Sequence, residues 1–335
     1  GHAASADGPG TGKVSASAPG AAGNSRHERG AVMNAQSKIQ LGDGDDAFRA
    51  QVVGGSEASA LFDANPWLTH FELWHRKNGT IATPDFGGDD RIEAGIRLEP
   101  VIVDWACDKW GYVKRDTPRR LANGKGLGGH PDQAVTCPDR GDGILEVKTA
   151  DWLQAKAWGD EPPLHYQLQA MTYMGLAGVQ WADLVMLVGG NELRRFQIEF
   201  RPKLYAEIER RVVAFWQSIA DNSPPSADYR RDLPPLTELY RSGTDEVADL
   251  TGDNLAAVAA AEYLAADEAM KAAEKRRDIA KAELVDKMGH ASEALIQGFR
   301  FRATTVAATP DREAVAGEII RGRKSYRRYS VKEMK

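Results

Sequence analysis

A carboxylate and an ammonium group lie two residues apart in a short apolar segment, residues 143–150 (GILEVKTA). Its length and composition predict a β-strand. Because strand side chains alternate between two faces, Glu146 and Lys148 project to one side and Val147 to the other. This pattern is typical of an ion pair on a solvated sheet, and also of a metal ligand beside a cation that orients a water molecule. The tripeptide by itself favours the ion pair.

Glu99 is a second carboxylate in an unusual position. Residues 91–110 predict a helix, since apolar side chains recur at spacings of three and four, and Glu99 shares their face. A carboxylate on an apolar face is costly unless it binds a cation, pairs with an arginine or reaches the rim of the fold. Pro100 predicts that the helix kinks or starts a new segment there. The apolar positions on this face are Ile92, Ile96, Val103, Ala106 and Trp110.

Asp132 precedes a predicted strand that runs to Cys137 and is followed by a turn. Together with residues 143–150, this strand predicts a β-hairpin that brings Asp132 near Glu146. Two adjacent carboxylates repel each other, so the arrangement favours a divalent cation between them. The alternative is that Asp132 only caps a turn after Pro131.

A candidate anion site comes earlier in the chain. Gly54 and Gly55 lead into a helical stretch, and Ser56 occupies an N-cap-like position. Free N–H groups, the serine hydroxyl and the charge of Arg49 suit an anion, although an ordinary capped helix has the same pattern. Pro66 predicts the start of the next helix, and we assign its aromatic stripe to the core: Trp67, Phe71 and Trp74.

From residue 91 onward, the predicted elements form an α/β core in the order helix, hairpin, helix, strand, strand, helix. The second of these helices begins near residue 164 and carries Gln167 and Gln169 on different faces, where each amide also suits solvent. Residues 252–289 predict a long amphipathic helix whose seam of small residues packs on another helix or subunit. The two strands and the last core helix are predicted at residues 183–190, 193–200 and from 202 onward.

Composition sets broad limits. The 335 residues are 42% hydrophobic and 27% charged, with a net charge of −5, which is typical of a globular protein without global attraction to nucleic acid. Two cysteines, Cys107 and Cys137, are too few for a disulfide framework or a four-cysteine cluster, and they favour a reducing cytoplasm. No run of 18 apolar residues occurs, so we expect no membrane span. The basic, tyrosine-containing residues 321–335 suit either a nucleic-acid backbone or a solvated edge strand.

In chain order, the chemical motifs resemble those of the PD-(D/E)XK nuclease superfamily, and more closely those of the YqaJ-like viral recombinase, or lambda exonuclease, family. The resemblance covers about residues 45–220 and implies a central mixed sheet flanked by helices, with a C-terminal long helix and β-hairpin extension. Gln133 follows Asp132 where family members commonly have glycine. The motifs are Arg49 with Gly54-Gly55-Ser56-Glu57, Arg97-Leu98-Glu99-Pro100, Pro131-Asp132, Leu145-Glu146-Val147-Lys148-Thr149 and His165-Tyr166-Gln167-Leu168-Gln169.

The resemblance implies a divalent-metal site. Asp132, Glu146 and the main-chain carbonyl of Val147 would hold Mg²⁺, for which Mn²⁺ can substitute, and Glu99 would complete the acidic cluster. Hard oxygen ligands suit magnesium, and phosphodiester hydrolysis needs a positioned water and neutralisation of the charge that develops on the phosphate.

The same resemblance assigns roles to four other residues. Lys148 would orient or deprotonate the attacking water, and Gln167 would help to hold that lysine or the water. Arg49 and Ser56 would grip the 5′-phosphate of the strand being degraded. The implied function is a 5′→3′ exonuclease that resects linear duplex DNA to 3′ single strands for phage-type recombination, with a single-strand annealing protein as partner and a trimeric assembly.

On the basis of this resemblance and of composition, we divide the chain into three parts. Residues 1–38 are a disordered leader that resembles a tag remnant, 39–235 the nuclease domain, and 236–335 a helical and β-hairpin accessory region. Two alternative functions stay open. One is another PD-(D/E)XK nuclease, of the helicase-associated or CRISPR-adaptation type, and the other is a catalytically silent DNA-binding or assembly protein. Metal-dependent digestion of DNA separates the silent protein from the nucleases.

Overall fold

The computed structural model describes residues 45–84 and 88–303, so the predicted leader and the basic residues 321–335 lie outside the described residues. The chain divides into two compact units. Within the described part, no helix is both long and apolar enough to cross a membrane. Of the described residues, the first unit holds 45–73, 83–84 and 88–223, and the second holds 74–82 and 224–303.

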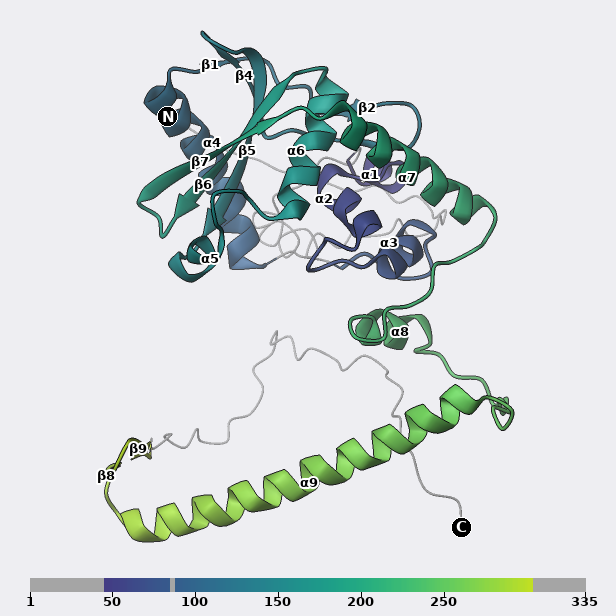
Figure 1. Ribbon diagram of the computed structural model, residues 1–335, viewed down its shortest axis with the longest axis vertical. Coiled ribbons are helices and arrows are strands. Elements are labelled where there is room, and N and C mark those ends of the chain that lie inside the picture. Colours follow the sequence, from purple (N-terminus) through teal and green to yellow (C-terminus); the bar gives the residue numbers. More distant parts are fainter. Residues whose placement is uncertain (1–44, 85–87, 304–335) are drawn as a thin grey trace, which may run out of the picture. The chain divides into compact units, whose positions relative to one another are not determined.

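A five-stranded mixed sheet is the centre of the first unit, with the strand order β1-β4-β5-β6-β7 (Figure 1). Strands β5 and β6 are parallel, and the other neighbours are antiparallel. This confirms the predicted mixed sheet, and it confirms the hairpin as the pair β4–β5. The strands are β1 (Val113–Lys114), β4 (Gln133–Cys137), β5 (Gly141–Ala150), β6 (Trp181–Val188) and β7 (Glu192–Glu199), while β2 (Leu121–Ala122) and β3 (Gly128–Gly129) form a separate ribbon.

Helices α4 (Asp90–Trp110) and α6 (Leu164–Ala177) contact the middle of the sheet. Buried side chains of α4 share a hydrophobic core with Leu145 and Val147, which point to one face of β5. Glu146 therefore points to the other face, where α6 lies. The further helical elements of this unit include α1 (Asp45–Gln51), α2 (Gly55–Ala58), the 3₁₀ helix Ser59–Phe62, α5 (Trp152–Ala157) and α7 (Pro202–Ala220).

The start predicted for the helix after Pro66 is wrong. Helix α3 (His70–Lys77) begins four residues later, because the hydroxyl of Thr69 accepts a hydrogen bond from the Glu72 N–H and caps it there. Trp67 consequently lies in the preceding loop with 69% of its surface exposed, outside the core to which we assigned it. The other two aromatic residues of the predicted stripe, Phe71 and Trp74, are buried as expected.

Two further local predictions need correction. Gly54 is the N-cap of α2, and its N–H donates to Glu57 Oε2 at 2.7 Å, so Ser56 lies inside the first turn. Helix α4 continues through Pro100, so of the two alternatives predicted there, a kink or a new segment, the new segment is wrong. Its apolar stripe is buried only in the second half, since Ile92 and Ile96 are 41% and 43% exposed.

The second unit contains the predicted long helix, α9 (Asn254–Met288), and the predicted hairpin of β8 (Glu293–Ile296) and β9 (Phe299–Arg302) (Figure 1). The carboxylate of Asp253 accepts hydrogen bonds from two N–H groups at the start of α9, and Gly289 ends the helix with a positive φ of 58°. A short helix, α8 (Leu233–Leu239), precedes them. In the described part of the chain, α9 has no buried residue.

Candidate active site

The β4–β5 hairpin brings the first two predicted site residues together. Gln133 pairs with Leu145, so the next position outward places Asp132 beside Glu146. The main-chain N–H of Val147 donates to Asp132 Oδ2 at 2.7 Å and fixes that carboxylate against β5. Gln133 donates through its side-chain amide to Thr117 Oγ1 at 3.0 Å and so ties the start of β4 to the preceding loop.

Glu146 is completely buried, and its two carboxylate oxygens have different surroundings. Its Oε1 accepts hydrogen bonds from Lys148 Nζ, at 2.6 Å, and from Gln169 Nε2. Its Oε2 is buried without a hydrogen-bond partner among the described residues. A buried carboxylate oxygen in that state is costly, and a proton or a cation on it would remove the cost.

Lys148 contacts two of the predicted metal-ligand groups. Besides the Glu146 carboxylate, its ammonium donates to the main-chain oxygen of Val147 at 3.1 Å. The ammonium also lies 5.6 Å from the centre of the Tyr166 ring. Burial lowers the pKa of Lys148, but the charges of Glu146 and Asp132 outweigh it and keep this pKa above its usual value. Lys148 is therefore a charged group at neutral pH.

The carboxylates influence one another electrostatically. Burial raises the pKa of Glu146 to about 8, and repulsion by Asp132 adds to this effect. Burial likewise raises the pKa of Glu99 to about 7, again with a contribution from Asp132. Glu99 therefore lies within electrostatic reach of Asp132 and Lys148. Among the described residues, however, no three His, Cys, Asp or Glu side chains converge tightly enough to form a metal-binding group.

A divalent cation fits the donor atoms that do meet here. They are carboxylate oxygens of Asp132 and Glu146 and the carbonyl oxygen of Val147, and all are hard ligands of the kind that Mg²⁺ prefers. The unpartnered Oε2 of Glu146 has capacity for a ligand bond. The carbonyl oxygen of Val147 and Oε1 of Glu146 already accept hydrogen bonds from one cation, the ammonium group of Lys148.

The two glutamines of α6 differ in what they contact. Gln169 is buried and reaches Glu146, although the sequence offered no reason to prefer it over Gln167. Gln167 does not reach Lys148: its amide nitrogen donates to the Pro162 carbonyl at 2.8 Å, and its oxygen accepts from Arg201 at 2.7 Å. The predicted role of Gln167 stays a prediction, and Gln169 is the residue that the sequence reading missed.

The predicted phosphate-binding residues lie near this face of the sheet. Burial raises the pKa of Tyr173 on α6, the charges of Glu146 and Asp132 add to this effect, and the charge of Arg49 opposes it. Arg49 therefore shares an electrostatic environment with the carboxylates. Ser56 is exposed, and its main-chain oxygen accepts a hydrogen bond from the Asn65 side chain at 2.9 Å.

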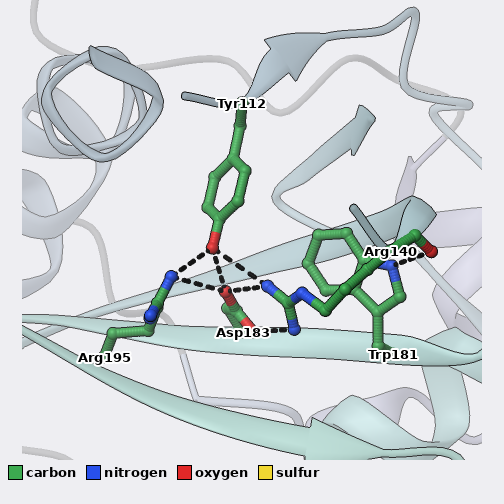
Figure 2. Close-up of polar contacts among 5 residues, drawn as sticks. All are labelled: Tyr112, Arg140, Trp181, Asp183 and Arg195. Carbon is green, nitrogen blue, oxygen red and sulfur yellow. Dashed lines mark hydrogen bonds and ion pairs between the residues drawn. The ribbon is translucent and has the colours of Figure 1, made fainter. Parts of the chain in front are cut away.

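A second polar cluster lies on the α4 face of the sheet (Figure 2). Asp183 is fully buried on β6. Its carboxylate accepts hydrogen bonds from both terminal guanidinium nitrogens of Arg140, at 2.9 and 2.7 Å. The hydroxyl of Tyr112 donates to the same carboxylate and accepts from Arg195 at 2.7 Å. The Arg140 guanidinium also lies 3.7 Å from the centre of the Trp181 ring. This network braces the turn before β5 against β6 and β7, and its signal in the sequence was one acidic residue within a buried apolar strand.

Comparison with known protein families shows what the part of the chain around this site is similar to. The model of the YqaJ-like viral recombinase domain matches residues 46–180, a range that contains all the predicted site residues. This part of the chain is therefore similar to the YqaJ-like viral recombinase domain, the family that the motifs resemble.

One curated relative is the uncharacterized protein YqaJ of Bacillus subtilis (strain 168), which is 27% identical over 190 residues. That match covers 54% of this chain and 57% of the relative. Among solved structures, the alkaline exonuclease LHK-Exo of Laribacter hongkongensis in complex with dAMP has a TM-score of 0.44 and 22% identity, over 53% of this chain and 94% of that one. A phage-related exonuclease from Haemophilus somnus 129PT has a TM-score of 0.39 and 15% identity, over 51% of this chain and 94% of that one.

Proposed function

We propose that this protein is a metal-dependent DNA exonuclease of recombination, which degrades linear duplex DNA from 5′ ends and leaves 3′ single strands. The observation that carries the proposal is the buried Glu146, which has one oxygen on Lys148 and Gln169 and the other without a partner, beside Asp132. The YqaJ-like viral recombinase domain around this site supports recombination as the process.

The site residues have separate tasks in this proposal. Asp132, Glu146 and the Val147 carbonyl would hold Mg²⁺, with Glu99 adding negative charge nearby. When bound, the ion would supply Lewis-acid stabilisation of the negative charge that develops during phosphodiester hydrolysis. Lys148 would hold the attacking water by a hydrogen bond and offset charge on the phosphate, because a cation in a water-poor site stabilises developing charge strongly.

Binding of DNA is the other half of the proposal. Arg49 and Ser56 would hold the 5′-phosphate of the degraded strand, on the side of the sheet where the carboxylates lie. Gln167 would act through its link to Arg201 in fixing the start of α6. By family resemblance, we further propose a trimer in the bacterial cytoplasm that works with a single-strand annealing protein.

Digestion of end-blocked DNA tests this proposal. Linear duplexes with phosphorothioate linkages at both 5′ ends, at both 3′ ends, or at neither are incubated with the protein and Mg²⁺. We expect blocked 5′ ends to stop digestion, blocked 3′ ends to have little effect, and closed circular DNA to survive. Digestion that proceeds from blocked 5′ ends would contradict the polarity, and no digestion of any duplex would contradict the enzyme activity itself.

A further inference from the structure

Trp67 is a large apolar side chain that solvent reaches over 69% of its surface. Burying an aromatic side chain is strongly favourable, but single exposed apolar side chains are common on protein surfaces. The surface of this domain does contain other exposed apolar residues, and exposure alone does not single out Trp67. Its anchoring and its neighbours do.

The backbone at Trp67 is held by one buried side chain. The Asn65 oxygen accepts hydrogen bonds from the N–H groups of Trp67 and Leu68, both at 2.9 Å. The amide nitrogen of the same side chain donates to the main-chain oxygen of Ser56 at 2.9 Å. Asn65 thus ties the loop that presents the indole to the helix that carries Ser56, a proposed phosphate contact.

A short series of aromatic rings connects this indole to the proposed catalytic lysine. The Trp67 ring meets His165 edge-on, at 5.1 Å between ring centres, and lies 6.5 Å from Tyr166. The Tyr166 ring is in turn 5.6 Å from Lys148 Nζ. The exposed indole is therefore linked to Lys148 through one intervening ring, that of Tyr166 on α6.

We propose that the Trp67 indole is a stacking surface for an unpaired nucleobase of the DNA strand that reaches Lys148. This inference rests on the proposed function and adds a contact to the base, where Arg49 and Ser56 would contact only phosphate. Every nucleobase has a flat π-face, so a stacking contact tolerates any sequence, as an exonuclease requires. An indole beside the site would hold the strand end after its base pair has opened.

A double-mutant cycle between protein and DNA tests the contact. The affinity of the protein for a fluorescent duplex with a short unpaired 5′ end is measured in EDTA, so that no strand is cut. The variants are Trp67→Leu, which keeps apolar bulk without a π-face, and Trp67→Phe, which keeps a ring. The matched control is Trp105→Leu, because Trp105 is 40% exposed on α4. Each is also tested on DNA with an abasic nucleotide at successive unpaired positions.

We expect Trp67→Leu to weaken binding about tenfold or more, Trp67→Phe to weaken it less, and Trp105→Leu to change it less than about twofold. At one unpaired position, the abasic DNA should weaken wild-type binding similarly but leave the Trp67→Leu variant unaffected. Equal DNA affinities of wild type and Trp67→Leu would overturn the inference. It would also be overturned if the loss of affinity caused by Trp67→Leu and the loss caused by the abasic nucleotide were additive at every position.

The same set of measurements separates this inference from the proposed function. If the wild type digests 5′ ends with Mg²⁺ and Trp67→Leu behaves as Trp105→Leu does, only the stacking contact is refuted. If the wild type neither binds nor digests DNA, the proposed function fails and the stacking contact fails with it. Thermal unfolding of each variant confirms that it is folded, and a normal melting temperature is expected because the indole is mostly exposed.

Discussion

Gln169 donates a hydrogen bond through its side-chain amide to Oε1 of Glu146, from the helix that covers that face of the sheet. Lys148 donates to the same oxygen. Two donors on one oxygen orient the carboxylate and leave Oε2 as the atom with unused capacity. Gln169 is therefore a positioning residue, which acts on the proposed metal site through Glu146.

Replacing Gln169 should weaken the metal site more than replacing Gln167. In Gln169→Leu the Glu146 carboxylate loses one of its two donors, and we expect about a 10- to 100-fold loss of affinity for Mg²⁺ or Mn²⁺. Titration calorimetry with the metal alone measures this without any DNA. The matched control is Gln167→Leu, whose side chain contacts Pro162 and Arg201 instead. Equal metal affinities for the two variants would show that Gln169 does not position Glu146.

The charge of Glu99 should make the metal-free protein less stable at neutral and alkaline pH. Its pKa is 4.5 in the unfolded reference and about 7 in the folded protein, so the folded state holds the proton more tightly. This stabilisation is complete below pH 4.5 and is lost as the pH rises through 7. Glu99→Gln is neutral throughout, so at pH 8 it should be more stable than wild type by about 1 kcal/mol.

Urea unfolding from pH 5 to pH 8, in EDTA and then with Mg²⁺, measures the effect of Glu99. The stability advantage of Glu99→Gln should grow with pH in EDTA and shrink with Mg²⁺, because a nearby cation reduces the cost of a charged Glu99. A stability advantage of Glu99→Gln that does not change with pH would contradict the raised pKa of Glu99. An advantage that is the same with and without Mg²⁺ would show that Glu99 does not interact with the metal.

The network around Asp183 should be important for stability. Arg140→Ala removes the paired hydrogen bonds to a fully buried carboxylate, and we expect a loss of about 3 kcal/mol in the free energy of unfolding. Arg210→Ala is the control, since Arg210 pairs with Glu207 at the surface and should contribute less than about 1 kcal/mol. Similar losses for both variants in denaturant titrations would mean that Arg195 and Tyr112 satisfy Asp183 without Arg140.

Gly143 should tolerate no side chain. A Cβ there would come within 2.2–2.4 Å of the Trp181 ring, which is buried. Gly143→Ala should therefore cost about 1–3 kcal/mol of stability. At Gly159 a Cβ would meet nothing within 4 Å, so Gly159→Ala is the matched control and should stay close to wild type. A wild-type melting temperature for Gly143→Ala would contradict the close approach of β5 to this ring.

The sequence predicted the elements whose patterns are long and regular. A continuous apolar run predicted the strand that is β6, periodic spacing predicted the long helix that is α9, and Gly289 marked the end of α9 correctly. The hairpin that brings Asp132 near Glu146 was also predicted, from a turn between two strands, and the structure adds its register. These features depend on local patterns and on the alternation of strand side chains.

The features that the sequence did not reveal depend on contacts between distant residues. Whether Gln167 or Gln169 meets Glu146 is decided by the packing of α6 on the sheet, 23 residues further along the chain from Glu146. Trp67 looked like a core residue because its spacing to Phe71 fits a helix, but Thr69 provides a better cap and leaves the indole outside. Competition between two helix starts cannot be settled from propensity alone.

Cleavage of a linear duplex by the wild type and by Lys148→Ala, with Mg²⁺ or with EDTA, tests the central claim most directly. Lys148→Ala removes the only cation that hydrogen bonds to Glu146 among the described residues. We expect the wild type to digest the duplex only with Mg²⁺, and the folded variant to be at least about 100-fold slower. Equal rates for the two proteins, or digestion by the wild type in EDTA, would contradict the assignment of this site.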